Sequence, residues 1–230
     1  MLLSARELSA GYGAIRIVNA VSIDLAAGET LAVLGRNGVG KTTLLRALVG
    51  LADRPTGVLE IDGEPIPARR PRRLAKLGVA FVPDDRGVFP RLTVAENLQL
   101  AGLVGYSPSR IDPYALFPDL AARRNQPAGT LSGGQQQQLA IGRALATGPR
   151  LLVIDELSQG LQPSIVGDLA DALLRVTRER QLALILVEQN PELAMRICER
   201  VIVMQRGEIA IAGTSAALKS DPRLVDLLVV

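Results

Sequence analysis

The sequence of 230 residues contains no histidine and no tryptophan, and its only cysteine is Cys198. The absence of histidine excludes imidazole as a catalytic base or metal ligand. The single cysteine excludes an internal disulfide and a metal site built from several thiolates, and it fits a reducing compartment. Because aromatic residues make up only 3% of the chain and hydrophobic residues 48%, the core must consist mainly of Leu, Val, Ile and Ala.

Long hydrophobic runs are also missing. No apolar stretch approaches the ~18 residues needed to cross a bilayer, and Met1-Leu2-Leu3 is followed at once by polar residues, unlike a signal peptide. We therefore expect a cytosolic chain, or one that is held at a membrane only through a partner. The net charge of +3 is weaker than that of a dedicated nucleic-acid-binding protein. The length fits one domain, or one core with a small lobe.

One stretch carries a complete phosphate-binding motif. Leu31 to Leu34 reads as a buried strand, the next eight residues (GRNGVGKT) match G-x-x-x-x-G-K-[ST] without a gap, and Thr43 to Gly50 reads as a helix. Glycines let successive N–H groups turn toward an anion, and the helix adds its positive dipole end. The pattern predicts that Lys41 reaches the β- and γ-phosphates of a nucleoside triphosphate and that Thr42 binds Mg²⁺.

The N-terminal third is predicted to be rich in strands. Leu2 to Leu8 and Ile15 to Leu25 alternate as strands do, and residues 57–66 read as a hairpin that turns at Asp62-Gly63. Tyr12, between two glycines, is either a turn aromatic at the edge of the core or an exposed ring on which a base stacks. The basic cluster from Arg69 to Lys76 is either a solvated helix start or a contact for lipid headgroups or an acidic partner.

The middle of the chain changes to helical patterning. After an expected strand from Leu77 to Val82 and a loop at residues 83–87, residues 92–146 read as short helices, with a plausible capping box at Thr93 and Glu96. Four prolines, Pro108, Pro113, Pro118 and Pro127, divide this region, which is predicted to be a separate helical lobe. Within it, Leu131-Ser132-Gly133-Gly134-Gln135 opens a helix that runs to about Thr147, and its N–H groups suit an anion.

Two carboxylates follow the next predicted strand. Leu151 to Ile154 is fully apolar and ends at Asp155 and Glu156, which a phosphate-loop protein can use for Mg²⁺ and for the attacking water. An amphipathic helix is expected from Ser164 to Arg180 and a buried strand from Leu182 to Val187. A helix to about Arg200, a hairpin at residues 201–211 and two short helices complete the chain. This alternation predicts an α/β fold with a mainly parallel sheet and a ligand at the carboxyl ends of its strands.

The motifs in this order resemble those of the ATP-binding cassette (ABC) ATPases. The resemblance covers essentially the whole chain. Its most specific evidence is the order of the motifs, in which LSGGQ follows a phosphate loop and precedes LLVIDE. It implies a RecA-like P-loop NTPase core with an N-terminal antiparallel β subdomain and a helical lobe that carries LSGGQ. In one domain of residues 1–230, the core would comprise residues 1–87 and 149–230, and the lobe residues 88–148.

The resemblance also implies a dimer in which two cassettes enclose two ATP molecules. Residues of the LSGGQ signature then act in trans, on the ATP held by the partner's phosphate loop. Carried over by position, Glu156 is the base that polarises water and Asp155 supports Mg²⁺, with Lys41 and Gln189 beside the γ-phosphate. The implied nucleotide-binding residues are Tyr12, Arg36, Asn37, Gly38, Val39, Gly40, Lys41, Thr42 and Thr43, and the implied signature residues are Leu131, Ser132, Gly133, Gly134 and Gln135.

Four positions depart from the family's pattern. Asp84 replaces the usual glutamine after a core strand and remains a candidate ligand of Mg²⁺, together with Thr42 and Asp155. Gln189 replaces the usual histidine, so this position can donate a hydrogen bond but cannot become cationic. Gln162 replaces an aspartate and Leu157 a proline. These changes affect the sensing of the γ-phosphate and signalling between subunits rather than ATP binding.

Three stretches resemble sequences of the hydrophobic amino-acid and amide importers: VEQN, FPRLTVAENL and LSGGQQQQLAIGRALA. Pro83-Asp84 is nearer the branched-chain amino-acid type, which we favour, whereas residues 160–164 are nearer the urea type. The resemblance implies a motor subunit that binds ATP and Mg²⁺. Its expected partners are a second ATPase subunit and two transmembrane permease subunits, to which a solute-binding protein delivers the solute. The subunit is expected at the cytoplasmic face of the membrane, and nucleic acid is not an expected partner. The alternative is a soluble cassette ATPase that acts on nucleic acid or ribosomes.

Overall fold

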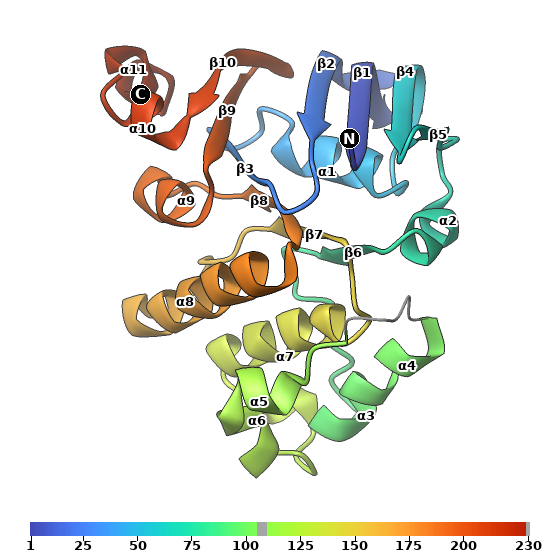
Figure 1. Cartoon of the computed structure of the whole chain (residues 1–230), viewed down its shortest axis with the longest axis vertical. Helices are drawn as coiled ribbons and strands as arrows, with labels where there is room; N and C mark the ends of the chain where they lie inside the picture. The colour runs from blue at the N-terminus through green and yellow to red at the C-terminus, as the bar shows by residue number, and fades with distance from the viewer. Residues whose placement is uncertain (105–109, 229–230) are drawn as a thin grey trace.

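A six-stranded sheet crosses the middle of the protein in the computed structural model, which describes residues 1–104 and 110–228 (Figure 1). Its strand order is β10-β9-β3-β8-β7-β6, and every neighbouring pair is parallel except β9 and β10. The predicted mainly parallel sheet is confirmed. The strands are β3 (Thr30–Gly35), β6 (Val79–Val82), β7 (Leu151–Asp155), β8 (Ala183–Val187), β9 (Arg200–Gln205) and β10 (Glu208–Thr214).

A second, antiparallel sheet lies over one face of the first. Its strand order is β2-β1-β4-β5, which confirms the expected antiparallel β region near the N-terminus. The strands are β1 (Leu3–Tyr12), β2 (Ile15–Leu25), β4 (Asp53–Ile61) and β5 (Glu64–Pro65), and Asp62-Gly63 forms the predicted hairpin turn. Helix α1 (Lys41–Leu48) packs between this sheet and the six-stranded one.

Helices cover the opposite face of the six-stranded sheet, where α7, α8 and α9 pack against it (Figure 1). The Thr93–Glu96 capping box at the start of α3 forms as predicted. The remaining helices, in chain order, are α2 (Pro71–Lys76), α3 (Val94–Gln99), α4 (Ala101–Val104), α5 (Pro113–Leu116), α6 (Pro118–Ala122), α7 (Gly133–Leu145), α8 (Pro163–Arg180), α9 (Pro191–Ile197), α10 (Ser215–Lys219) and α11 (Pro222–Leu228), with a 3₁₀ turn at Ala128–Thr130.

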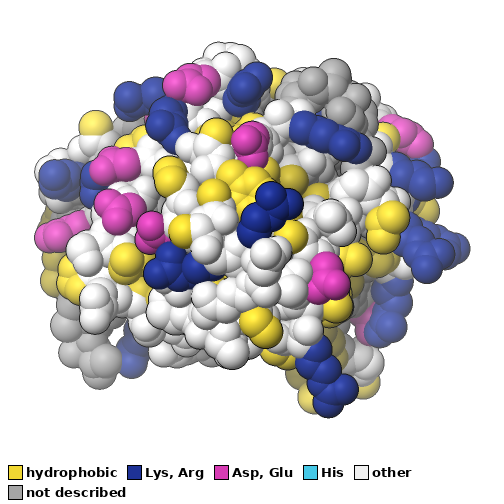
Figure 2. All heavy atoms as spheres, turned by 90° about the horizontal axis from the view of Figure 1, so that it is seen from below, with side chains coloured by type: hydrophobic (Ala, Val, Ile, Leu, Met, Phe, Trp, Pro, Cys, Tyr) yellow, Lys and Arg dark blue, Asp and Glu magenta, His cyan; other side chains and the backbone are white. Residues whose placement is uncertain are grey.

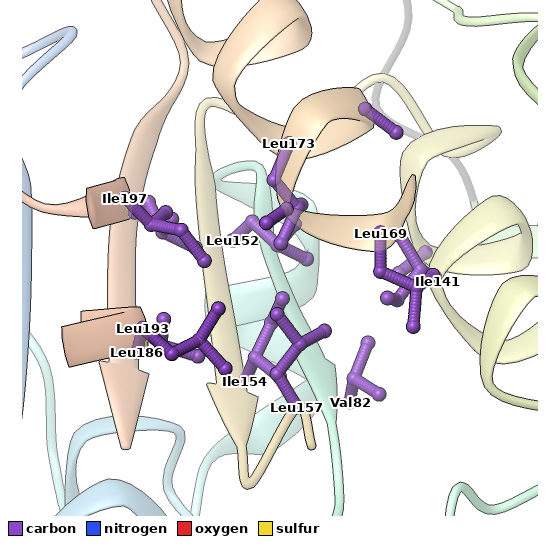
Figure 3. Close-up of a cluster of buried hydrophobic side chains, with 14 of the residues drawn as sticks. Val82, Ile141, Leu152, Ile154, Leu157, Leu169, Leu173, Leu186, Leu193 and Ile197 are labelled. Atoms are coloured by element: carbon purple, nitrogen blue, oxygen red, sulfur yellow. The ribbon is translucent and has the colours of Figure 1, made fainter. Parts of the chain in front are cut away.

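The two faces of the six-stranded sheet contribute to two hydrophobic clusters. Side chains that alternate along β7, such as Leu152 and Ile154, pack against Leu169 and Leu173 of α8 in one cluster (Figure 3). The intervening Leu151 and Val153 pack in the other cluster, with α1 and the antiparallel sheet. Because β3, β7 and β8 are buried along their full lengths, they read as continuous apolar runs in the sequence. The helices of the middle region share the first cluster with the sheet rather than forming a core of their own.

Several predicted element ends are wrong by a few residues. The helix expected to reach Arg200 ends at Ile197, because Cys198 is extended and Arg200 already pairs with Leu31 and Thr214 in the sheet. Similarly, α7 ends at Leu145 instead of Thr147. The single cysteine, Cys198, is buried. Pro108, one of the four predicted helix breakers, lies outside the described residues.

The basic cluster lies at the exposed start of α2, and part of its charge is paired within the chain. Arg69 forms an ion pair with Asp53, and Arg73 forms one with Glu64. Basic side chains also gather toward the right edge of the surface in Figure 2, where hydrophobic side chains lie among them.

In residues 1–104 and 110–228, no helix is long and apolar enough to cross a membrane.

Candidate nucleotide-binding site

The candidate site lies where three neighbouring parallel strands end. In the sheet, Val33 of β3 pairs with Val187 of β8, and Val187 pairs with Asp155 of β7. The segments that follow these strands therefore leave the sheet at the same edge, as is usual for ligand sites in such sheets. This arrangement brings the phosphate loop, Asp155 with Glu156, and Gln189 together, although Gly35 and Gln189 are 154 positions apart in the sequence.

The phosphate loop connects β3 to α1 through three glycines with positive φ. Gly35, Gly38 and Gly40 have φ values of 144°, 78° and 107°. A Cβ on Gly35 would lie 2.6 Å from the carbonyl oxygen of Met204, so only glycine fits this position. Arg36, Asn37 and Gly38 are exposed and Val39 is half-buried, whereas Gly40 and Thr43 are buried at the helix start. The loop thus presents its backbone to solvent at the positive end of a helix, as an anion site requires.

Lys41 lies inside the phosphate loop. Its side chain is 5% exposed, and Nζ donates hydrogen bonds to the carbonyl oxygens of Gly35, at 2.7 Å, and Arg36, at 2.9 Å. Burial lowers the pKa of Lys41, and the carboxylates of Glu156, Asp155 and Glu188 oppose this shift. The ammonium group is therefore held within the loop, surrounded by acidic groups whose charge it partly compensates.

Asp155 is fully buried and is bonded to the first turn of α1. The Thr42 hydroxyl donates to Asp155 Oδ1 at 3.2 Å, whereas Asp155 Oδ2 has no hydrogen-bond partner within the described part of the chain. Burial raises the pKa of Asp155 to about 6, the hydrogen bond from Thr42 lowers it, and the charges of Asp84 and Glu156 raise it further. An unpartnered buried carboxylate oxygen beside a hydroxyl suits a hard cation such as Mg²⁺.

Glu156 and Gln189 contact each other at the rim of this site. The Gln189 amide Nε2 donates to Glu156 Oε1 at 2.7 Å. Glu156 has a φ of 61°, which is uncommon for a residue other than glycine. The structure thus brings Glu156, the expected base, together with Gln189, which is expected beside the γ-phosphate, across β7 and β8.

Tyr12 is exposed at the end of β1, which favours the stacking interpretation over a role in the core. Its hydroxyl accepts a hydrogen bond from Arg46 Nη1 at 3.4 Å, and Arg46 Nη2 lies 3.9 Å from Asp84 Oδ1. Arg46 was not among the predicted site residues, although it lies one helical turn after Thr42 and Thr43. It connects the two predicted residues Tyr12 and Asp84 and compensates the negative charge of Asp84.

The signature residues open α7 in a reciprocal capping box. Ser132 Oγ accepts from Gln135 N at 3.3 Å, and Gln135 Oε1 accepts from Ser132 N at 3.1 Å. The N–H groups expected to be free for an anion are therefore partly used within the motif. Leu131 and Gly134 are buried, and Gly134 leaves no room for a Cβ, which would lie 2.7 Å from Ile165.

Arg86 is a second residue that sequence analysis did not identify. It has a φ of 66° and donates to Gln136 Oε1 at 3.2 Å, while its guanidinium group lies over Gly133. Among the hydrogen bonds of residues 1–104 and 110–228, none joins the signature motif to the phosphate loop of the same chain. Within the described part of one chain, these two predicted parts of the site are thus not joined by a hydrogen bond.

Comparison with known proteins identifies relatives across nearly the whole chain. A family model described as "ABC transporter" matches residues 18–159. The high-affinity branched-chain amino acid transport ATP-binding protein BraG of Pseudomonas aeruginosa is 38% identical over 229 residues, which cover 98% of each protein. A probable branched-chain amino acid transport ATP-binding protein, LivF of Archaeoglobus fulgidus, is 35% identical over 94% of each protein.

Solved structures share the fold at lower sequence identity. A nucleotide-free ATP-binding cassette from an ABC transporter superimposes with a TM-score of 0.85 at 23% identity, over 100% of this chain and 99% of that one. A dimeric cassette, MJ0796 bound to ADP and Pi, superimposes with a TM-score of 0.82 at 23% identity, over 93% of this chain and 98% of that one. At this identity, the likeness establishes the fold: an α/β P-loop NTPase core with the additional β-sheet and helices described above.

The raised pKa of Asp155 predicts a specific dependence of stability on pH. Between its ordinary pKa of 3.8 and about 6, the folded protein holds a proton that the unfolded chain releases. The free energy of unfolding contributed by this group therefore falls as pH rises through that window. We expect Asp155→Asn to raise the Tm of the nucleotide-free protein at pH 8 by about 2–4 °C, equivalent to about 1 kcal/mol at this size, and to leave it unchanged at pH 4.

Differential scanning calorimetry at both pH values measures this effect. Asp168→Asn, on the exposed face of α8, is the matched control and should not change the Tm at either pH. A Tm increase of the same size at pH 4 and pH 8 would contradict the role of the buried charge.

Proposed function

This chain belongs to the ABC transporter family as one of its ATP-binding, ATP-hydrolysing subunits, and from this premise we propose that it drives the import of branched-chain or related hydrophobic amino acids. The observation that carries the proposal is the 38% identity with an amino-acid transport ATP-binding protein over 98% of both chains. The candidate site supplies the chemistry, since a phosphate loop, a buried carboxylate and a half-buried carboxylate bonded to an exposed amide meet at one sheet edge.

In the proposed mechanism the phosphate loop binds the triphosphate. Backbone N–H groups of residues 36–43 surround the phosphates, and Lys41 exchanges its bonds to the carbonyl oxygens of Gly35 and Arg36 for the β- and γ-phosphates. Tyr12 offers its exposed ring to the base. Such an exchange keeps the ammonium group paired in both states, so that it is never buried alone.

The residues around Asp155 fit a Mg²⁺ ion. Thr42, Asp155 and the more distant Asp84 would hold it, and the ion would neutralise charge on the phosphate oxygens. Because Arg46 lies within ion-pair distance of Asp84 and offsets its charge, Thr42 and Asp155 would be the main residues that hold the ion, and Asp84 would contribute negative charge nearby.

Glu156 acts as the base toward the attacking water. Its Oε1 already accepts from Gln189, which leaves Oε2 for the water, and a base so placed typically supplies about 10²–10⁴-fold in rate. Gln189 orients Glu156 and offers its amide to the γ-phosphate. Since an amide does not titrate, this contact keeps the same charge at every pH near neutrality.

The signature motif completes a site on a second ATPase subunit. Ser132, Gly133, Gly134 and Gln135 contact the ATP bound by that partner, as members of this family work in dimers. The capping box fixes the backbone of these residues before the partner arrives, so that their orientation does not depend on the contact itself. The partner is a second copy or a related cassette. Within each subunit, residues 88–148 form the lobe that carries the motif.

Of the two transmembrane permease subunits, one binds a groove of this chain between α2, β6, α4 and α7. The groove has a volume of about 420 Å³ and is lined mainly by apolar side chains, including Phe81, Phe89 and Leu103. Phe89 and Leu103 are exposed, by 51% and 80%, and Arg143 lies over the Phe89 ring at 5.3 Å. Such a surface suits an amphipathic helix of the permease. The chain would thereby be held at the cytoplasmic face of the membrane, with the solute delivered by a solute-binding protein on the other side.

Transport assays with the reconstituted complex test the solute. We expect ATP-dependent uptake of radiolabelled leucine into proteoliposomes that contain this chain, its permease subunits and its solute-binding protein. Urea uptake without leucine uptake would replace the proposed solute with an amide. ATPase activity that RNA or ribosomes stimulate in the absence of permease subunits would instead support a soluble cassette ATPase.

The role of Glu156 predicts a variant that binds ATP but does not hydrolyse it. Glu156→Gln should leave the affinity for MgATP unchanged, because the phosphate loop remains intact, and should lower kcat by at least about 100-fold. Fluorescent-nucleotide binding and phosphate release measure the two quantities. Normal turnover in this variant would mean that another group acts as the base.

The groove predicts a variant that fails to bind the permease. Phe89→Asp should reduce the amount of permease that copurifies with this chain by about 10-fold or more, because it places a charge in an apolar contact. MgATP binding should not change. Val58→Asp, at a similarly exposed apolar position on the antiparallel sheet, is the matched control. Equal loss of copurification in both variants would exclude a specific role of the groove.

A further inference from the structure

Glu188 is a buried carboxylate that none of the roles above uses. It directly follows β8, is 1% exposed and accepts four hydrogen bonds. Glu188 Oε1 accepts from the backbone N–H groups of Leu157, at 2.9 Å, and Ser158, at 2.8 Å. Glu188 Oε2 accepts from the Ser158 hydroxyl, at 2.9 Å, and from its neighbour Gln189 N, at 3.1 Å.

A buried carboxylate is costly unless hydrogen bonds or a cation stabilise its charge. In the described ranges 1–104 and 110–228, no lysine or arginine forms an ion pair with Glu188, so neutral donors supply most of the stabilisation. Hydrogen bonds from N–H groups to an ionised acceptor are roughly twice as strong as those between neutral groups. The four donors of Glu188 are therefore held firmly in place.

Two of the residues that donate to Glu188 directly follow Glu156 in the chain. Glu156 itself has a left-handed φ of 61°, a conformation that persists only where the surroundings impose it. On one side, Glu156 N donates to Val187 O at 3.1 Å, and on the other, Leu157 and Ser158 donate to Glu188. Three consecutive residues of this turn are thus bonded to Val187, the last residue of β8, and to Glu188, which follows it.

The same carboxylate also holds the residue that contacts Glu156. Glu188 Oε2 accepts from Gln189 N, and the Gln189 side chain donates to Glu156 Oε1. Glu188 is consequently bonded to both members of the Glu156–Gln189 pair through the backbone next to each of them. A shift of Glu188 would move both side chains, whereas Lys41 and Thr42 are held by separate contacts.

We propose that Glu188 is a positioning residue for ATP hydrolysis, which fixes Glu156 and Gln189 relative to each other without touching the nucleotide. The proposal rests on the assignment of Glu156 as the base. A positioning role differs from a purely structural role in what its loss changes. Loss of alignment lowers kcat in a protein that is still folded and still binds ATP normally.

Glu188→Gln tests the proposal with the smallest change of shape. The amide can accept two bonds through Oε1 but presents N–H donors where Oε2 accepts from Gln189, so the connection to Gln189 is lost. We expect kcat for ATP in the complete transporter complex to fall about 10- to 100-fold, since a misplacement of about 1 Å has effects of this size. The KM for ATP and the affinity for MgATP should not change.

Two further variants calibrate this result. Ser158→Ala removes only the hydroxyl donor and leaves three hydrogen bonds to Glu188, so kcat should fall by about 3-fold or more, with an unchanged KM. Glu192→Gln, the same substitution at an exposed position four residues later, should have no effect on kcat.

A folded Glu188→Gln protein with wild-type kcat, or one in which KM rises while kcat stays unchanged, would overturn the positioning role. If Glu188→Gln does not fold, Ser158→Ala decides, and wild-type kcat in that variant would overturn the proposal. Glu156→Gln, assayed in parallel, separates the two assignments. An inactive Glu156→Gln with a fully active Glu188→Gln rejects only the role of Glu188, whereas an active Glu156→Gln rejects the base and the positioning role together.

Discussion

The parallel pairing of β3, β8 and β7 is the constraint on which the site depends. Their hydrogen-bonded register sets Val33, Val187 and Asp155 side by side, so that three chain segments leave the sheet at one edge. The strands can be apolar throughout because both faces of the sheet are covered, one by the antiparallel sheet and α1, the other by α7, α8 and α9. This double burial keeps the polar groups of the site at the strand ends and supplies the rigid support that they need.

Three carboxylates lie close to one lysine at this edge, and each has a different environment. Asp155 is buried with one unpartnered oxygen, and its raised pKa reflects the cost of that charge. Glu188 is equally buried but accepts four hydrogen bonds, whereas Glu156 lies nearer the surface and contacts an amide. The three groups can therefore take three roles: ligand of a cation, organiser of the backbone, and base toward water.

The positions that depart from the family's pattern are accommodated by local contacts. Asp84 adds a negative charge near Asp155, and Arg46 lies within ion-pair distance to offset it. Gln189 cannot carry the positive charge of a histidine, but its amide reaches Glu156. The contacts around Arg86 connect the segment after β6, which borders the groove, with the start of α7. The chain thus contains a continuous set of contacts between the proposed permease surface and the signature motif.

The phosphate loop, the signature motif, the order of elements and the apolar strands were all readable from the sequence, because each depends on residues adjacent in the chain or spaced with a helix or strand period. These patterns determined the fold class and most of the candidate site residues. The ends of α7 and α9 were less accurate, since strand pairing of Arg200 overrode the helical pattern nearby. Only the tertiary structure decided which carboxylate organises the backbone of Glu156 and which arginine faces Asp84. It also showed that, among the described residues, the signature motif has no hydrogen bond to the phosphate loop of its own chain. The physical reason is that the two contacts join residues 30 and 38 positions apart, and strand order and register, which no local pattern encodes, bring them together.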